Sequence, residues 1–309
     1  MNMQSSNVLP WHRNTAVHVD GLSLQEQLRA ARLDWSVNIG PFRYGDQFQY
    51  TDPKVKVAYR DIDGKYIDKY IDRKPWQNRE ILQHFHDFCN ESDLSLKVEY
   101  IGSLNKGLIL YAAARLPVIT DVRKAGDIIE WWLILRDSHM NGSGLKVSLY
   151  ANRLICTNGM HRLIREGNKV IAHLGEFNKD RINELLGAAT RTLRKEEEVY
   201  EKLTGVPVTK EEAVMHLINA FGDPKKTIDE QPKPVQIGLR LFEGQAKGSE
   251  LITAYNTAWG LLNSVSEYFN WHAPSRGSAQ TQLNALLQGG RYSGIKKMQD
   301  QLVSCYLRS

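Results

Sequence analysis

Residues 127–137, DIIEWWLILRD, form the stretch of sequence that decides the fold. Apolar side chains would lie on both faces of a strand formed here, with no regular alternation of apolar and polar residues. A strand that is apolar on both faces is buried on both sides. We therefore expect a central strand, with Trp131 and Trp132 anchoring the packing on opposite faces because successive side chains of a strand point in opposite directions.

Other strand patterns lie on either side of this stretch. Residues 97–113 predict a hairpin that turns at Asn105-Lys106-Gly107, and residues 54–71 predict a second hairpin at Asp63-Gly64, where both turn positions need positive φ. Residues 145–159 predict one more strand. Together these runs predict a predominantly antiparallel sheet of five or more strands.

Helical patterns fill most of the remaining chain. Ser23 and Glu26 have the spacing of a capping box, and a helix after Asn78 has an apolar face that we expect to pack on the sheet. The second half predicts helices at residues 178–203, 209–221, 253–271 and 294–307. In the third of these, a polar stripe is expected to face solvent; it consists of Asn256, Gly260, Asn263 and Glu267.

The expected fold is therefore α+β. Residues 1–176 form a predominantly antiparallel sheet with packed helices, and residues 177–309 form a mostly α-helical region that can pack on the same core. Residues 222–235 are rich in proline and charge and are expected to form a linker within that helical region.

Composition excludes several classes of protein. The 309 residues are 42% hydrophobic and 24% charged, which is typical of globular proteins, and no apolar run approaches the 18 residues needed to span a bilayer. The net charge of +5 permits a polyanionic partner without requiring one. Three cysteines without a C-x-x-C pair, and an N-terminus without signal-peptide features, indicate a cytoplasmic protein with no membrane partner.

Motifs that would indicate common enzymes are missing from the sequence. It contains no phosphate-binding P-loop, no dinucleotide fingerprint, no H-E-x-x-H and no G-x-S-x-G. His84 and His86 lie two apart in a predicted helix and point away from each other, so they cannot share a metal ion. We expect no cofactor and no metal.

Two groups of cations are candidates for binding nucleic acid. A two-residue turn at Asp63-Gly64 would place five cations on one face of the hairpin, near aromatic residues that can stack on bases: Lys54, Lys56, Arg60, Lys65 and Lys69, with Tyr44, Phe48 and Tyr50 nearby. The second group lies near the C-terminus and consists of Arg291, Lys296 and Lys297. The alternative is that both groups are ordinary solvated surface.

A polar loop with neighbouring strand residues is the third candidate. It comprises His139, Ser143, Arg153 and Asn158, and its backbone amides and charges could bind a phosphate. The sequence also permits ordinary turn chemistry here, or a nucleophilic pair of Cys156 and His139.

Several segments resemble the phage and plasmid-like proteins that contain domain of unknown function 932. The segments are LDWSVN at 33–38, AYRDIDGKYI at 58–67, PWQN at 75–78, IGSLNKGLILYAAARLP at 101–117, LRDSHMNGSGLKVSLYANRLICTNGM at 135–160 and TAWGLLNSVSEYFNWHAPSR at 257–276. The loop replaces an acidic residue of the family pattern by Met140-Asn141, which argues against an aspartate acting there. The resemblance implies a mobile genetic element and a bacterial cytoplasm, and it implies no established reaction.

The preferred hypothesis is a protein that binds single-stranded DNA or other nucleic acid in recombination or annealing. Annealing requires strands held by their backbones with bases presented, and it requires no covalent chemistry, so we favour a protein without catalytic activity. A homo-oligomer would suit this task. Two alternatives remain open: an enzyme acting on a phosphate-bearing substrate at His139, Arg153 and Asn158, and an interaction protein that counters host defence.

Overall fold

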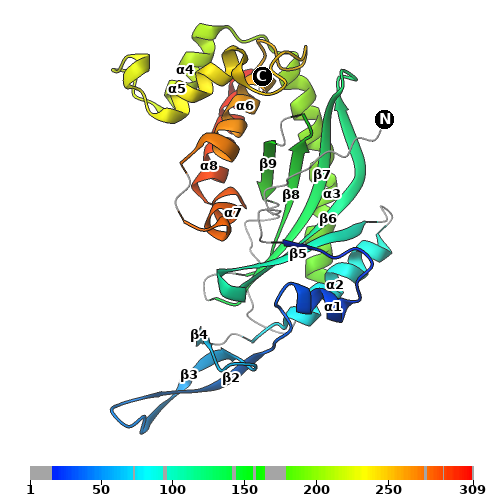
Figure 1. Ribbon diagram of the computed structural model, residues 1–309, viewed down its shortest axis with the longest axis vertical. Helices are drawn as coiled ribbons and strands as arrows, with labels where there is room; N and C mark the ends of the chain where they lie inside the picture. The colour runs from blue at the N-terminus through cyan, green and yellow to red at the C-terminus, as the bar shows by residue number, and fades with distance from the viewer. Residues whose placement is uncertain are drawn as a thin grey trace.

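The computed structural model describes residues 16–71, 74–92, 96–140, 144–155, 158–163, 179–274, 277–287 and 289–307. It confirms the α+β fold, with the strands in the first half and most of the helices in the second (Figure 1). The strands form two separate antiparallel sheets rather than one.

The main sheet has six strands and the twisted β6–β7 hairpin at its centre. Their order is β1 (Ala16–His18), β5 (Lys97–Leu104), β6 (Ile109–Val122), β7 (Asp127–Ser138), β8 (Lys146–Arg153) and β9 (Asn158–Leu163), and each neighbouring pair is antiparallel. The predicted turn at Asn105-Lys106-Gly107 is confirmed as a short 3₁₀ segment between β5 and β6.

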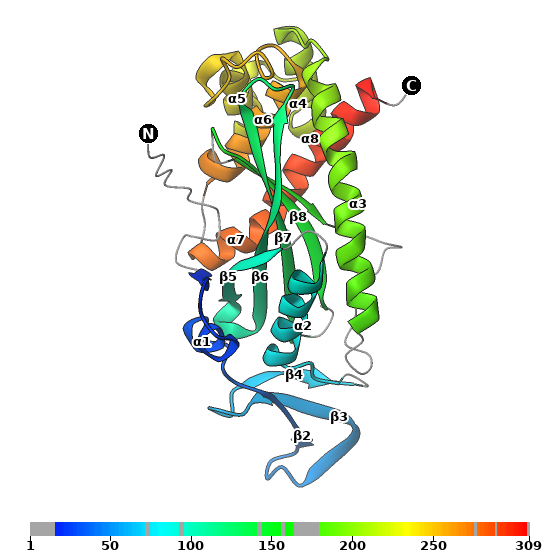
Figure 2. The ribbon, with the colours of Figure 1, turned by 90° about the vertical axis from the view of Figure 1, so that its right-hand side faces the viewer.

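The second sheet has three strands and projects from the main body. It consists of β2 (Val37–Tyr44), β3 (Tyr50–Arg60) and β4 (Tyr66–Tyr70), and we call residues 37–70 the arm. Figures 1 and 2 show the arm at the end of the molecule opposite the C-terminal helices. Much of its surface therefore remains in contact with solvent.

Helices lie on both faces of the main sheet, and α4 and α5 pack on other helices. The helices of the described chain are α1 (Leu24–Ala30), α2 (Asn78–Glu91), α3 (Lys179–Thr204), α4 (Lys210–Phe221), α5 (Lys233–Arg240), α6 (Ala258–Glu267), α7 (Ala279–Leu287) and α8 (Gly290–Tyr306). The predicted capping boxes at Ser23 and Thr209 are both present. Helix α2 packs on β5 and β6 as expected, and the long α3 follows the sheet (Figure 2).

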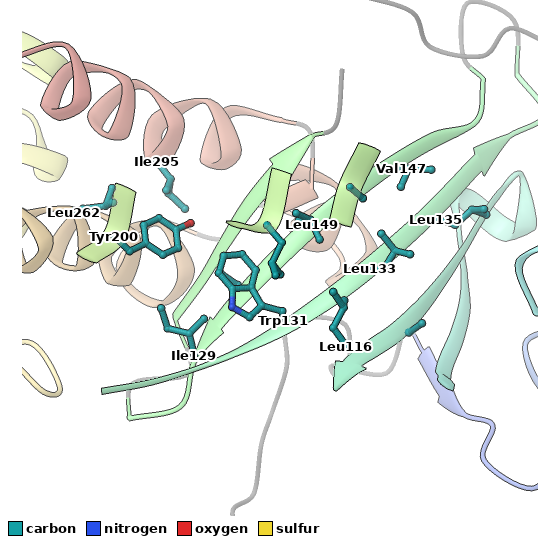
Figure 3. Close-up of a cluster of buried hydrophobic side chains, with 14 of the residues drawn as sticks. Leu116, Ile129, Trp131, Leu133, Leu135, Val147, Leu149, Tyr200, Leu262 and Ile295 are labelled. Carbon is teal, nitrogen blue, oxygen red and sulfur yellow. The ribbon is translucent and has the colours of Figure 1, made fainter. Parts of the chain in front are cut away.

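The two tryptophans of β7 face opposite sides of the main sheet, as predicted. Trp131 stacks on Tyr200 of α3, with ring centroids 5.8 Å apart and planes 6° apart (Figure 3). Trp132 lies in a second buried cluster with Leu283 and Leu287 of α7. Burial of both faces explains why the apolar residues of β7 do not alternate with polar ones.

The main core contains residues from both halves of the chain. Phe85 of α2 and Leu133 of β7 belong to the same buried cluster as Leu217 of α4 and Trp259 of α6. The expected boundary at residue 176 lies outside the described residues.

The predicted linker near residues 222–235 is instead a compact part of the helical region. Gln231 is buried, its side-chain amide donates to the carbonyls of Asp223 and Lys226, and it accepts from the Asp223 amide. Helix α5 then begins at Lys233. The prolines and charged residues correctly predicted an interruption between two helices. Side-chain hydrogen bonds hold this interruption in a compact turn.

Of the expected polar stripe, Asn256 is exposed and precedes α6, whereas Gly260, Asn263 and Glu267 are buried, so the expected exposure was wrong for Asn263 and Glu267. The Asn263 amide donates to the Trp259 carbonyl at 2.9 Å, and a Glu267 carboxylate oxygen accepts from the Lys247 amide at 3.2 Å. Residues 246–257, expected to be partly helical, form turns that cover this helix. Position 260 has to be glycine, because a Cβ at this position would lie 1.9 Å from the carbonyl oxygen of Ala254 in these turns.

Candidate nucleic-acid interface

The hairpin of β3 and β4 forms as predicted, but its turn and its register differ from the prediction. The Arg60 amide donates to the Lys65 carbonyl, so four residues lie in the turn rather than two, and of Asp63 and Gly64 only Gly64 has a positive φ. The register also shifts between Ala58 and Tyr59. Each change alters which residues lie opposite one another.

The prediction that five cations share one face is therefore wrong. Lys56 lies opposite Tyr70, whereas Lys69 lies opposite Val57, and directly opposite residues project from the same face. Lys69 thus lies on the face opposite to Lys56. We call the face that carries Val57 and Lys69 the outer face of the arm, because the other face packs through Ala58 and Tyr70 into a small buried cluster.

Arg60 anchors the arm to the body. Its guanidinium lies 4.9 Å from the centroid of the Trp35 ring, 3.3 Å from an Asp63 oxygen and 3.3 Å from the carbonyl of Lys106. Only 14% of its side chain is exposed. These contacts give Arg60 a structural role, in contrast to Lys54, Lys56, Lys65 and Lys69, which are exposed.

Three aromatic side chains form a continuous row on the outer face. Phe42 stacks on Tyr44 with ring centroids 6.1 Å apart, and Tyr44 lies 5.6 Å from Tyr50 on the neighbouring strand. Tyr44 and Tyr50 are 49% and 56% exposed. The Lys69 ammonium lies 4.8 Å from the centroid of the Phe42 ring. We call Phe42, Tyr44 and Tyr50 the aromatic row.

Phe42 was missing from the sequence prediction. The signal was present, because Asn38, Gly40, Phe42 and Tyr44 alternate with the inward-facing Val37 and Ile39. A period of two should have placed Phe42 and Tyr44 on one face. Their position relative to Tyr50 depends on the hairpin register, which the sequence did not determine.

The arm carries exposed cations besides Lys69. Arg43, Lys54, Lys56 and Lys65 are exposed, and none of their side chains forms an ion pair within the described part of the chain. By strand alternation Arg43 and Lys56 project from the face opposite to the aromatic row. Three aspartates of the arm have oxygens bonded to this chain's own groups: Asp52 to the Lys54 amide, Asp61 to the Ser36 amide and Asp63 to Arg60.

His139 belongs to the joint between the arm and the main body. It is fully buried; its Nε2 lies 2.8 Å from the Asn78 side-chain oxygen, and its carbonyl accepts a 2.7 Å hydrogen bond from the Tyr70 hydroxyl. The Asn78 amide in turn donates to the carbonyls of Leu33 and Trp35. These contacts join β4, the start of α2 and the end of β7.

Arg153 forms a buried ion pair at the other end of the main sheet. Its Nε and one terminal nitrogen donate to the two oxygens of Asp127 at 2.6 and 2.8 Å. Asp127 also accepts from the Thr253 hydroxyl at 2.7 Å and the Trp259 indole at 2.9 Å. Arg153 donates further to the Gly248 carbonyl. The pair therefore fastens the turns of residues 246–257 to the sheet.

The predicted polar cluster is not a cluster in the structure. Arg153 lies opposite Ile129 near the start of β7, whereas His139 follows the end of that strand at Ser138. Nine residues of strand at about 3.3 Å each separate the two positions by roughly 30 Å. Asn158 lies opposite Arg153, so it too is remote from His139. Ser143 and Cys156 lie outside the described residues.

The C-terminal cations are engaged in packing the helices. Arg291 is buried and donates to the carbonyls of Ala273 and Pro274. Lys296 pairs with Asp300 one turn later in α8, and the Lys297 ammonium donates to the Ala220 carbonyl. These residues do not continue the cationic surface of the arm.

Other features with possible chemistry lie within the core. Burial raises the pKa of the Cys89 thiol to about 12 and lowers the pKa of Arg136 to about 10, although Asp137 opposes the second shift. Within the described residues, no three histidine, cysteine, aspartate or glutamate side chains come together as metal ligands would. In the same part of the chain, no helix is both long and apolar enough to cross a bilayer.

Comparison with known families assigns the chain. Residues 72–288 match the model of Domain of unknown function (DUF932). The chain belongs to this family. The match begins two residues after β4 ends, so it covers strands β5 to β9 of the main sheet and helices α2 to α7, and it leaves β1, α1, the arm and α8 outside. No curated protein and no solved structure matches the chain. The function of this DUF932 protein therefore has to be argued from its own surface.

Proposed function

We propose that this DUF932 protein binds single-stranded nucleic acid, with the outer face of the arm as the binding surface. The observation that carries the proposal is the aromatic row, in which Tyr44 and Tyr50 are exposed and Phe42 is partly exposed, with Lys69 beside it. Exposed aromatic patches bordered by polar groups mark interaction sites in proteins. These residues lie on a projecting arm and stabilise little of the core.

The chemistry of the row fits unpaired bases. Rings about 6 Å apart present flat apolar surfaces on which successive bases stack, and every base has such a surface, so binding depends little on sequence. Lys69 beside Phe42 supplies charge for the phosphate backbone, and Lys54 lies close to the row in the bulge of β3 between the partners of Pro41 and Phe42. Bases inside a duplex are already stacked on one another, which makes a single strand the preferred partner.

The face of the arm, rather than its edge, is suited to a partner. Pro41 lies within the edge strand β2, and proline in an edge strand opposes pairing with a further strand because it has no amide hydrogen. The start of β2 is also covered, since the Val37 amide and carbonyl both bond to the Gln77 side chain.

We further propose an annealing or recombination role on a phage or plasmid. Annealing requires a strand held with its bases accessible, and a ring that stacks on the face of a base leaves the hydrogen-bonding edge of that base open. Several copies in a homo-oligomer would extend this surface along a strand.

Fluorescence anisotropy with a labelled, unstructured oligonucleotide tests the proposal. Stacking contributes about 1–3 kcal/mol per base, so Tyr44→Ala with Tyr50→Ala should weaken binding at least tenfold. Changing Lys54 and Lys69 to Gln should reduce the salt dependence of the affinity, and Lys56→Gln on the opposite face should reduce it less. Tyr255→Ala is the matched control, because Tyr255 is 66% exposed but lies outside the arm.

Two results would contradict the proposal. One is the absence of binding at low salt. The other is binding that the tyrosine and lysine variants leave unchanged, which would place the contact elsewhere. Capture of a host protein that survives nuclease treatment, without binding to the oligonucleotide, would favour the host-defence alternative. The enzyme alternative requires His139 and Arg153 at one site, and their separation along β7 opposes it.

A further inference from the structure

The tip of the arm presents one phenylalanine to solvent. Residues 45–49 connect β2 to β3, and Phe48 among them is 68% exposed, more than any other aromatic residue of the described chain. Figures 1 and 2 show that this connection is at the far end of the arm, remote from the main sheet. Phe48 therefore has no part in the core.

The backbone of the tip is unfavourable for phenylalanine. Phe48 has a φ of 54°, a left-handed conformation that glycine or asparagine adopts with less strain. The conformation is held by a 3.0 Å hydrogen bond from the Phe48 amide to the Gly45 carbonyl and a 2.9 Å bond from the Gln47 amide to the Gln49 side chain. Folding alone gives no reason for a large apolar side chain at this position. A contact made by the side chain would supply one.

The tip continues the aromatic row. Tyr44 and Tyr50 lie opposite each other as the last pair of the β2–β3 ladder, directly before the connection that contains Phe48. A strand stacked along Phe42, Tyr44 and Tyr50 thus ends at the tip, where any paired continuation of that strand would meet Phe48.

We propose that Phe48 is a wedge that inserts at the junction between single-stranded and double-stranded nucleic acid and opens the terminal base pairs. The inference rests on the proposed function and adds an activity to it. Apolar side chains that enter a base step unstack it, and Phe is one of the residues used in this way. Because the aromatic row binds only the opened strand, binding itself shifts the equilibrium from paired to unpaired bases. No energy source or covalent step is needed.

A hairpin-opening assay tests this activity on the full chain. The probe is a DNA hairpin with a short stem, a single-stranded tail, and a fluorophore and quencher at the stem end; a labelled unstructured oligothymidine reports strand binding separately. The wild-type protein should open the stem as its concentration rises. Phe48→Ala should raise the protein concentration required at least tenfold while changing oligothymidine affinity less than twofold. Phe48→Trp should retain the opening activity.

Three outcomes would overturn the wedge. If the wild-type protein binds oligothymidine but leaves the stem closed, the proposed function survives and the wedge does not. If Phe48→Ala weakens both activities by the same factor, Phe48 is one more stacking residue. If Phe48→Ala instead changes the mass of the protein in solution, the tip contacts a second copy of the chain. Failure to bind oligothymidine at all refutes the proposed function itself. A thermal melt of each variant checks that the variant is folded. We expect every variant to fold, because Phe48 is exposed and has no part in the core.

Discussion

The buried pair of Arg153 and Asp127 gives the sharpest prediction about stability. Replacing Arg153 by methionine leaves the Asp127 carboxylate in the core with the Thr253 hydroxyl and the Trp259 indole as its donors, but without a cation. Both members of the pair are at most 1% exposed. Removing one partner of such a pair costs about 3–5 kcal/mol, because the remaining charge is buried and uncompensated.

This cost translates into a measurable shift of the melting temperature. At about 2.1 cal/mol/K per residue, unfolding of 309 residues carries an entropy of about 0.65 kcal/mol/K. A loss of about 3–5 kcal/mol then lowers Tm by about 5–8 °C in a calorimetric or circular-dichroism melt. Arg29→Met is the matched control, because Arg29 and Asp34 are 68% and 41% exposed in their ion pair. We expect it to cost about 1 kcal/mol or less.

The pH dependence provides a second measurement on the same variant. Burial by itself raises the pKa of Asp127, but the hydrogen bonds and charge of Arg153, with the bonds from Trp259 and Thr253, outweigh it and hold the pKa below its ordinary value. The stabilisation is therefore present above the unfolded-state pKa of about 3.9 and is lost as pH falls through the lower folded-state value. The difference in Tm between wild type and Arg153→Met should narrow below about pH 4. An equal Tm at neutral pH would refute the reasoning.

Three further predictions concern the core and the joint. Gly260→Ala should destabilise the protein by about 1–3 kcal/mol in urea unfolding, because the added Cβ would meet the Ala254 carbonyl. Gly290→Ala is the control and should not destabilise the protein, because no atom lies within 4 Å of a Cβ at that position. Tyr70→Phe should cost about 1 kcal/mol through loss of the hydroxyl bond to His139; an unchanged unfolding midpoint would show that the bond is dispensable. In alkylation followed by mass spectrometry at pH 8, the exposed Cys305 should react before Cys89, whose thiol has a pKa of about 12; early modification of Cys89 would contradict its burial.

The sequence by itself determined the elements that depend on local chemistry. The capping boxes at Ser23 and Thr209 satisfy helix amides within a single turn, and the apolar stretch of β7 is readable because it is buried on both faces. The opposite directions of Trp131 and Trp132 follow from strand geometry alone. The α+β fold follows from these patterns together.

Tertiary structure decided everything that depends on register or on partners distant in the chain. A four-residue turn and one register shift moved Lys69 to the face opposite to Lys56, because one residue of slip reverses the direction of every side chain beyond it. The length of β7 separated His139 from Arg153, although the loop between their strands suggested that they were neighbours. Asn263 and Glu267 were read as solvated because the turns that bury them come from residues 246–257, outside the helix itself. Local patterns specify how a segment folds, whereas the candidate interface depends on which segments meet, and only long-range packing determines that.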